Sequence, residues 1–402
     1  MSNECFDIDR VREWFGSGEL MSSQGAVPSF VDLVRALGVV GGVPRCEVGV
    51  GTKEVLRHIG SPKRCLFVLV DGMGLDAVTA LPASSFLRRH LSGELRAVSL
   101  STTACALTTL ATGEWPGVHG VPGWWAYVDE SDLNVVPLPF IERGSGRPLG
   151  TLGIGPNTLF PVPSMWNRMV AGVTCFLPQE IVGSVYTTYL CGSAARIGYE
   201  TMDDAVALAS ETAASPDAPP LTHLYLPQLD TLAHELGPDA PEVRRLLMRL
   251  DGMLGRLARE ISAHTRIVVS ADHGMAAVLP ERHLILDQDN PLGDFLRCPP
   301  SGEATVPIFH VKEGMEEAFA AAFRAQHGEG FALLSRDDVV ELGLLGPDPL
   351  SPTARRRFGT YMALGPQPTK FLIRPFIGQH PDYVGVHGGF TPREMQIPLV
   401  VA

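Results

Sequence analysis

The chain has 402 residues, of which 45% are hydrophobic and 19% are charged, and its formal net charge is -12. This length allows a large buried core and predicts either one domain with a sizeable insertion or two domains. Nucleic-acid backbones are bound by clustered Lys and Arg, so the acidic balance argues against a polynucleotide partner. It leaves room for a small phosphorylated substrate, because bound divalent cations reverse the local field.

Two further features of the composition bear on the class of protein. The seven cysteines are spread along the chain without a CxxC pair, which argues against a disulfide framework or a Cys-based zinc site. The first 15 residues lack the apolar region of a signal peptide, and no uninterrupted apolar run approaches the roughly 20 residues that span a bilayer. We therefore expect a cytoplasmic protein that does not act on a membrane.

The predicted elements alternate between strands and helices. Residues 1–60 form a helical lead-in, with apolar residues at helical spacing over 31–40. The apolar run 65–70 predicts a strand buried on both faces, as in parallel sheets. Similar runs follow at 96–100, 222–226, 266–270 and 397–402, and 240–262 has the pattern of an amphipathic helix. This alternation predicts an α/β fold with a mainly parallel central sheet flanked by helices.

Two segments interrupt that alternation. The core is expected over 61–279, and its segment 123–200 is rich in Gly, Pro and aromatic residues, which predicts long loops and short strands over a site. Residues 280–385 contain a strand-like run at 305–311 and helix-like runs at 313–326 and 335–344. They predict a smaller α+β insertion, after which residues 386–402 return to the core as its C-terminal strand.

Acidic and imidazole side chains follow the predicted strands. Asp71 comes directly after the run 65–70, and ligands of parallel sheets bind outside the carboxyl ends of the strands. Asp230 and His234 have i, i+4 spacing, which places both on one face of a helix. Carboxylate oxygen and imidazole nitrogen are suitable ligands for zinc or a similar divalent cation. Taken singly, each has a structural alternative, such as the capping of a helix by Asp71.

Three more candidates strengthen this interpretation. Asp272 and His273 follow the run 266–270 and precede a glycine that permits a turn, and His387 lies beside two glycines before the last strand. Thr103 lies in a hydroxyl cluster ahead of a predicted helix, whose N-terminal N–H groups favour a phosphate oxygen. Capping of that helix by Ser101 or Thr102 is the alternative. Together these residues predict a metal-assisted hydrolase with a hydroxyl nucleophile.

With these residues in place, the chain resembles the alkaline phosphatase superfamily, and within it the type I phosphodiesterase/nucleotide pyrophosphatase family. The matching segments are VLVDGMG (68–74), STTACALTTLATGEWPGVHGV (101–121), LDTLAHELG (229–237), SADHGM (270–275) and HGGF (387–390). The resemblance implies an alkaline phosphatase-like core, two divalent cations (zinc, with manganese as the alternative) and cleavage of a phosphodiester or nucleotide pyrophosphate bond through a covalent phospho-threonine. It implies one cation held by Asp71, Thr103, Asp272 and His273, and the other by Asp230, His234 and His387.

One position departs from the family pattern. The nucleotide pyrophosphatases carry a phosphate-contacting Asn about 21 residues after the nucleophile, where this chain has Trp124. Trp124 and Trp125, with Tyr127, are candidates for an aromatic wall against a flat substrate group, although aromatic clusters also serve plain packing. Asn157, Tyr225 and Arg374 are further candidate phosphate contacts. A phosphomonoesterase, a phosphonate hydrolase or a phosphoryl or nucleotidyl transferase on the same metal core is the alternative function.

Overall fold

The structure of the chain is a computed structural model that describes residues 4–170, 172–261, 265–286, 290–374 and 379–402. Its centre is a seven-stranded sheet of order β2-β18-β9-β1-β8-β6-β7. The strands are β1 (Arg64–Val70), β2 (Leu91–Arg96), β6 (Val173–Pro178), β7 (Ala195–Tyr199), β8 (Leu221–Leu226), β9 (Thr265–Ser270) and β18 (Gln396–Val401). Strands β9, β1, β8, β6 and β7 are parallel, whereas β18 is antiparallel to both β9 and β2. The predicted α/β fold with a mainly parallel sheet is confirmed.

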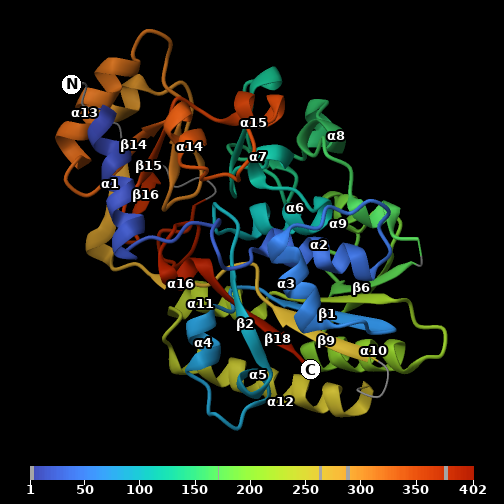
Figure 1. Cartoon of the computed structure of the whole chain (residues 1–402). Coiled ribbons are helices and arrows are strands. Elements are labelled where there is room, and N and C mark those ends of the chain that lie inside the picture. The colour runs from blue at the N-terminus through green and yellow to red at the C-terminus, as the bar shows by residue number, and fades with distance from the viewer. Residues whose placement is uncertain (1–3, 171, 262–264, 287–289, 375–378) are drawn as a thin grey trace.

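Helices cover both faces of this sheet. They are α2 (Phe30–Val40), α3 (Val50–Ile59), α4 (Leu75–Thr79), α5 (Phe86–Arg89), α6 (Thr103–Thr112), α7 (Pro116–His119), α8 (Pro156–Leu159), α9 (Val185–Cys191), α10 (Met202–Ala214), α11 (Gln228–Leu236) and α12 (Pro241–Ile261). Figure 1 shows α2, α3 and α6 on one face and α10 and α12 on the other. Strand β1 is enclosed between them, and all its residues after the first are buried, as its unbroken apolar run predicts.

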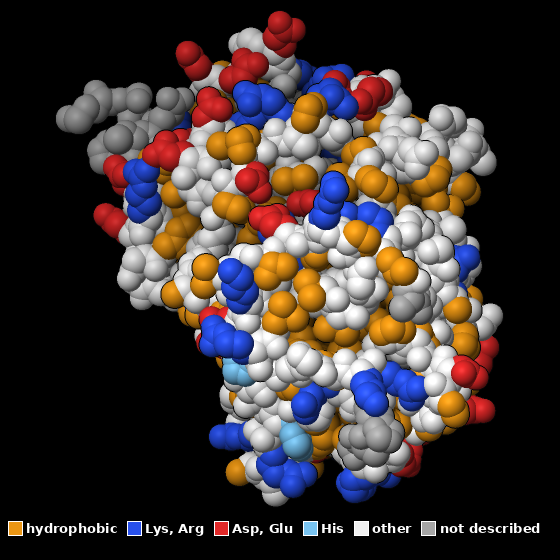
Figure 2. Space-filling model, turned by 45° about the vertical axis from the view of Figure 1, so that its right-hand side comes forward, with side chains coloured by type: hydrophobic (Ala, Val, Ile, Leu, Met, Phe, Trp, Pro, Cys, Tyr) orange, Lys and Arg blue, Asp and Glu red, His pale blue; other side chains and the backbone are white. Residues whose placement is uncertain are grey.

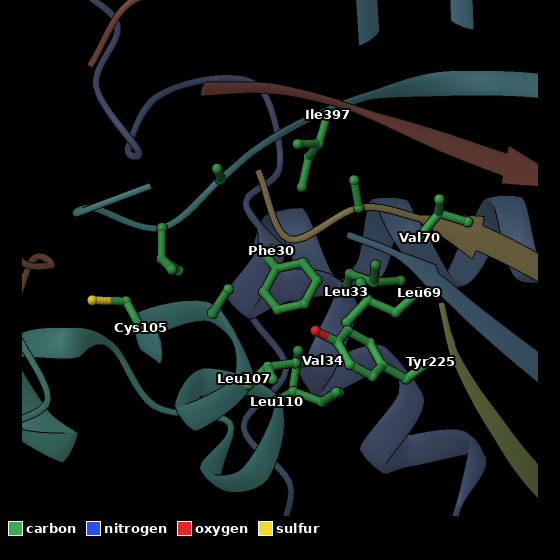
Figure 3. Close-up of a cluster of buried hydrophobic side chains, with 14 of the residues drawn as sticks. Phe30, Leu33, Val34, Leu69, Val70, Cys105, Leu107, Leu110, Tyr225 and Ile397 are labelled. Carbon is green, nitrogen blue, oxygen red and sulfur yellow. The ribbon is translucent and has the colours of Figure 1, made fainter. Parts of the chain in front are cut away.

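The core between β1 and its covering helices is built from large aliphatic and aromatic side chains. Phe30, Leu33 and Val34 of α2 point toward Leu69 of β1 and Leu110 of α6 (Figure 3). All five are essentially inaccessible to solvent. Burying each such side chain contributes roughly 1.5–3 kcal/mol, so this layer holds α6, and with it the residue at its N-terminus, rigidly against the sheet.

One strand lies elsewhere than predicted. The run 96–100 was expected to be a strand, but β2 ends at Arg96 and the chain continues as a buried connection to α6. Strand β2 is an edge strand with a half-exposed, polar sequence, so it carries no apolar run. The apolar residues after it are buried because they pass under the covering helices. The segment 123–200 also contributes two strands, β6 and β7, to the central sheet.

A smaller unit lies beside the core. Its four-stranded antiparallel sheet has the order β12-β13-β15-β14, and a parallel pair, β11 and β16, lies next to it. The elements are β11 (His283–Leu286), β12 (Ser301–Gly302), β13 (Pro307–Phe309), α13 (Glu316–His327), β14 (Ala332–Ser335), α14 (Arg336–Glu341), α15 (Pro352–Arg357), β15 (Tyr361–Leu364) and β16 (Lys370–Ile373). Phe309, Phe319 and Phe323 form its own aromatic core.

Helix α1 (Glu4–Ser17) packs on this smaller unit, as Figure 1 shows. Arg10 donates to the carbonyls of Glu329 and Phe331, and Asp7 accepts from Arg324 at 2.8 Å. Short elements complete the chain: β3 (Ala126–Val128), β4 (Leu133–Val136) and β5 (Ile141–Glu142) form a three-stranded sheet, β10 (Ala276–Ala277) pairs with β17 (Gly385–Val386), and α16 (Pro392–Met395) precedes β18. Trp125, the residue before β3, pairs with Gly302 of β12, and their backbones exchange two hydrogen bonds.

The surface carries a mixture of charged and apolar side chains, as expected from the composition. On the face in Figure 2, acidic and basic side chains are interspersed with apolar ones, and no unbroken basic area covers it. Among the helices of the described residues, none combines the length and the apolar character that crossing a membrane requires.

Candidate metal-binding active site

The predicted ligands gather at the carboxyl ends of the central strands. Asp71 follows β1, Asp272 and His273 follow β9, and Asp230 and His234 lie on α11, which begins two residues after β8. His387 follows β17, whose carbonyl at Gly385 faces α11. Because parallel strands end at the same edge of the sheet, segments as far apart in the chain as Asp71 and His387 reach one site.

The first ligand group consists of Asp71, Asp272 and His273. Their ligand atoms lie within 4.8 Å of one another, and all three residues are buried. His273 Nε2 is 3.5 Å from Asp71 Oδ1 and 3.5 Å from Asp272 Oδ2. Its Nδ1 is 3.0 Å from the carbonyl of Gly274, which can only accept, so Nδ1 carries the proton and Nε2 presents a lone pair to the carboxylates.

Two glycines make this close arrangement possible. Gly72 has φ +70°, and a Cβ there would lie 3.0 Å from Cβ of Asp230. Its N–H donates to Asp272 Oδ1 at 3.1 Å. At Gly274 a Cβ would lie 1.9 Å from the carbonyl oxygen of Arg393. Both turns therefore require a residue without a side chain. This explains why a glycine follows Asp71 and another follows His273 in the sequence.

The second group consists of Asp230, His234 and His387. His234 Nε2 is 3.3 Å from Asp230 Oδ2 and 3.2 Å from His387 Nε2. His234 Nδ1 donates to the carbonyl of Gly385 at 2.8 Å, which fixes the ring with Nε2 toward Asp230. Tyr383 packs on the other face of His234, with ring centroids 4.8 Å apart. Asp230 and His234, which their i, i+4 spacing places on one face of a helix, are thus joined by His387 from near the C-terminal end of the chain.

The two groups adjoin each other. The rings of His273 and His387 are stacked with centroids 3.9 Å apart. Burial, together with the charges of Asp272 and Asp230, raises the pKa of Asp71 well above its ordinary value, and burial raises the pKa of Asp272 to about 7. Such shifts mean that positive charge is needed at the first group to keep both carboxylates ionised.

The second group has the opposite balance. Burial opposes the charged forms of Asp230 and His234, but their mutual attraction outweighs it in both. The pKa of Asp230 falls to about 2 and that of His234 rises to about 9. A proton shared in this way occupies the position that a cation would take, since ligand imidazoles must be deprotonated to bind a metal.

The donor atoms fit divalent cations. Among the described residues, Asp272 Oδ2 and Asp230 Oδ1 are buried acceptors without a hydrogen-bond partner, and both face their ligand groups. Buried polar atoms are rarely left unpaired in folded proteins, so their pairing with a cation is the physical explanation. Carboxylate oxygens and imidazole nitrogens without thiolate suit zinc and similar divalent ions.

Thr103 lies at the first ligand group. It is the first residue of α6, and its Oγ1 is 3.2 Å from His273 Nε2 and 3.5 Å from Asp71 Oδ1. The alternative role of the hydroxyl cluster is not what the structure shows: Thr102 is the N-cap but makes no capping bond, and Ser101 Oγ donates to the carbonyl of Gly389 at 2.7 Å. That bond joins the segment before Thr103 to the loop of His387.

A cavity of about 670 Å³ opens over both groups. Asp71, Thr103, Asp230, His234 and His387 lie on its floor, whereas Asp272 and His273 are fully buried and contact it only through their neighbours. A cavity of this size suits a small ligand.

Some of the candidate substrate contacts line the cavity and others do not. Trp124, Trp125 and Tyr225 line the cavity, and the Tyr225 hydroxyl donates to Asp71 Oδ2. The guanidinium of Arg143 covers the Trp125 ring at 3.7 Å, which fixes the aromatic segment. Asn157 on α8 and Arg374 after β16 are exposed, and neither lines the cavity. Tyr127 does not line the cavity either, because its ring packs on His310.

The structure also brings residues to the site that sequence reasoning did not single out. Glu303 follows β12 and is buried in the cavity wall, where its Oε1 accepts from the N–H of Trp124 at 2.8 Å. Lys370 of β16 and Tyr383 line the same cavity. All three come from the region predicted as an insertion, and no local pattern around them indicates a site.

The fold and the two ligand groups define a class: α/β proteins with two neighbouring groups of carboxylate and imidazole ligands at the carboxyl edge of a mainly parallel sheet. The chain belongs to the type I phosphodiesterase/nucleotide pyrophosphatase family, whose model matches residues 65–339. This membership confirms the family resemblance found in the sequence.

Individual relatives agree with this assignment. An uncharacterized pyrophosphatase/phosphodiesterase of Schizosaccharomyces pombe is 36% identical over 76 residues, which are 18% of this chain and 16% of that protein. Murine ectonucleotide pyrophosphatase/phosphodiesterase 5 shares the fold with a TM-score of 0.62 and 16% identity, over 84% of this chain and 87% of that one. The human protein of the same name gives a TM-score of 0.63 and 18% identity over the same shares. An inactive murine variant with a threonine replaced by alanine, solved in complex with AMP, gives 0.63 and 17%, again over 84% and 87%.

Proposed function

We propose that this protein hydrolyses phosphodiesters through a covalent phospho-threonine formed on Thr103, with one divalent cation held at each ligand group. The observation that carries the proposal is the position of the Thr103 hydroxyl. Its Oγ1 lies 3.2 Å from His273 Nε2 and within reach of Asp71, so it belongs to the first ligand group while facing the cavity. A hydroxyl nucleophile needs such activation, since it is weak at its ordinary pKa.

The residues have separate tasks in this proposal. Asp71, Asp272, His273 and the Thr103 oxygen would hold one cation, and Asp230, His234 and His387 the other. Zinc is the ion we propose, with manganese as the alternative, because the ligands are His and Asp. The cations would favour the ionised hydroxyl and offset the charge that develops on the departing oxygen.

The chain's own atoms then account for the reaction. Thr103 Oγ1 bonds to phosphorus while the bond from phosphorus to one ester oxygen breaks, and that ester group leaves with a proton. Water next attacks phosphorus and breaks the bond to Oγ1, which restores the hydroxyl. Free N–H groups of the first turn of α6 are placed to receive a phosphate oxygen in both steps.

The comparisons support the nature of the substrate. Murine ectonucleotide pyrophosphatase/phosphodiesterase 5, which has a similar fold, was solved with AMP bound to an inactive variant in which one threonine is replaced by alanine. We propose for this chain a small phosphorylated substrate with an organic group of about nucleoside size, which the cavity of about 670 Å³ accommodates.

The test is a panel of nitrophenyl esters assayed with the metal-free protein and after addition of zinc or manganese. Elemental analysis of the active protein should give two cations per chain. The nitrophenyl diester should be cleaved with a higher kcat/KM than the nitrophenyl monoester. Activity that is indifferent to chelators, with no bound metal, would contradict the two-cation proposal. A tenfold preference for the monoester, about 1.4 kcal/mol in transition-state terms, would contradict the diesterase assignment.

A further inference from the structure

Aliphatic side chains from several segments of the core line part of the cavity, and we call them its aliphatic wall. Leu107, Leu138, Leu177, Ile181 and Leu190 line it, from α6, the segment before β5, the end of β6, the segment after it, and α9. Leu107 lies one helical turn after Thr103, so the wall begins beside the reacting hydroxyl. Aliphatic side chains bind no polar group, and their contact with an apolar ligand group releases the water that would otherwise cover both.

Positive charge is scarce around this wall. Among the described residues that line the cavity there is no Arg, and the one Lys is Lys370. Its Nζ donates to the carbonyls of His380, Pro381 and Tyr383, which use all three of its N–H groups. Burial lowers the pKa of His223, the histidine nearest to the wall along β8, to about 4, so this ring is neutral. Arg143 is not part of this lining: it stacks on the Trp125 ring and donates to the carbonyl of Pro300. Among the described residues of the lining, a second anionic group would therefore find no free cationic side chain.

A carboxyl group is present instead: burial raises the pKa of Glu303 to about 7, so this side chain is mostly negatively charged above that pH. Glu303 lines the cavity with only 7% of its surface exposed, and its Oε1 accepts from the N–H of Trp124. The side chain is packed against the loop of His387, because a Cβ on Gly388 would lie 2.4 Å from Glu303 Cγ. Glu303 therefore has little room to turn out of the cavity. Trp124 is also the position where the family pattern has a phosphate-contacting Asn.

We propose that the substrate is a phosphodiester with one uncharged, apolar ester group, seated on the aliphatic wall, and that Glu303 excludes substrates with a second anionic group, pyrophosphates included. This inference rests on the proposed function and names its substrate class. A diester fits these surroundings because its phosphate carries a single negative charge, which the two cations and the N-terminus of α6 receive. A pyrophosphate would bring a second phosphate toward the Glu303 carboxylate.

The experiment uses a series of alkyl nitrophenyl phosphates with methyl, butyl and octyl groups. A matched ester whose alkyl group ends in a carboxylate, and the nitrophenyl ester of thymidine monophosphate, complete the panel. All release the same nitrophenolate, so only the retained group differs. We expect kcat/KM to rise about threefold for each added methylene until the wall is filled, and to fall at least about tenfold when the chain ends in a carboxylate.

A second readout is independent of turnover. Thr103→Ala loaded with zinc is titrated calorimetrically with dialkyl phosphates of the same lengths, with the carboxylate-ended analogue and with inorganic pyrophosphate. Kd should fall with chain length, and the carboxylate-ended analogue should bind at least about tenfold more weakly than the uncharged one of equal length. Pyrophosphate should bind more weakly than the butyl diester.

Two variants test the part played by Glu303. Glu303→Gln keeps the shape of the side chain and an acceptor for the Trp124 N–H but removes the charge. It should therefore reduce the discrimination against the carboxylate-ended ester at least about fivefold. Glu180→Gln is the matched control: Glu180 also lines the cavity but is exposed to solvent, where water and salt screen its charge. It should change the discrimination less than twofold.

The outcomes separate this inference from the proposed function. Turnover and binding that are insensitive to chain length, or a preference for the carboxylate-ended ester or pyrophosphate, would overturn the inference and leave the diesterase standing. Discrimination that is unaltered in Glu303→Gln would overturn the role of Glu303. Chain-length-dependent binding without turnover of any ester would overturn the proposed function alone.

Discussion

Replacing Asp272 with Asn should stabilise the metal-free protein at alkaline pH while weakening cation binding. Asp272 is fully buried, and its Oδ1 accepts the N–H groups of Gly72 at 3.1 Å and His273 at 3.0 Å. An amide oxygen keeps both bonds. The amide nitrogen then takes the position of Oδ2, which has no hydrogen-bond partner among the described residues. The substitution therefore removes a buried charge without removing a contact.

The size of the effect follows from the pKa. Burial raises the pKa of Asp272 from 3.8 to about 7, so the folded state holds a proton that the unfolded state has lost over this interval. The free energy of unfolding therefore falls as the pH rises from about 4 to about 7, and stays low above it. At 1.36 kcal/mol for each pH unit the loss is about 4 kcal/mol. Interactions with Asp71 and entering water reduce it, and we expect on the order of 2 kcal/mol.

The assay is urea unfolding of wild type and Asp272→Asn in the presence of a chelator, at about pH 5 and about pH 8. Wild type should be less stable at the higher pH, and the variant should be the more stable of the two there. Zinc should then stabilise wild type strongly and the variant little, because a ligand stabilises the folded state according to its affinity. A metal-free variant that is less stable than wild type at about pH 8 would refute the reasoning.

Three other substitutions test separate parts of the site. Thr103→Ala should lower kcat by about 10⁴-fold or more while elemental analysis still finds most of the metal; near-normal activity would move the nucleophile to Thr102 or to water. Tyr225→Phe removes the hydroxyl that donates to Asp71 Oδ2 and should weaken zinc binding about tenfold, as measured by competition with a chelating dye; an unchanged affinity would exclude this supporting role. Trp124→Ala should change the ratio of kcat/KM for diester and monoester, and an unchanged ratio would remove Trp124 from substrate recognition.

The departure at Trp124 gains a structural meaning from Glu303. Where the family pattern has an amide side chain that contacts phosphate, this chain has an aromatic residue whose backbone N–H is bound to a carboxylate. The indole that replaces the expected amide lines the cavity, and the backbone of the same residue is held by Glu303.

The sequence by itself determined the central strands of the sheet and the residues of the two ligand groups. The apolar runs at 65–70, 222–226 and 266–270 match β1, β8 and β9, because a strand buried on both faces has to be apolar throughout. The polar residues at the carboxyl ends of such strands meet at one edge, so Asp71, Asp230 and Asp272 could be placed together without coordinates. Gly72 and Gly274 were informative for the same local reason, since each turn excludes a Cβ.

Only the tertiary structure decided which residues surround the cavity beyond the ligand groups. Strand β2 could not be predicted from an apolar run, because an edge strand needs none. Asn157, an expected phosphate contact, lies exposed on α8. Glu303 and Lys370 reach the cavity because the smaller unit folds back over the carboxyl edge of the core sheet. Their positions depend on contacts between segments far apart in the chain, and a local sequence pattern records the neighbours along the chain but not those across a cavity.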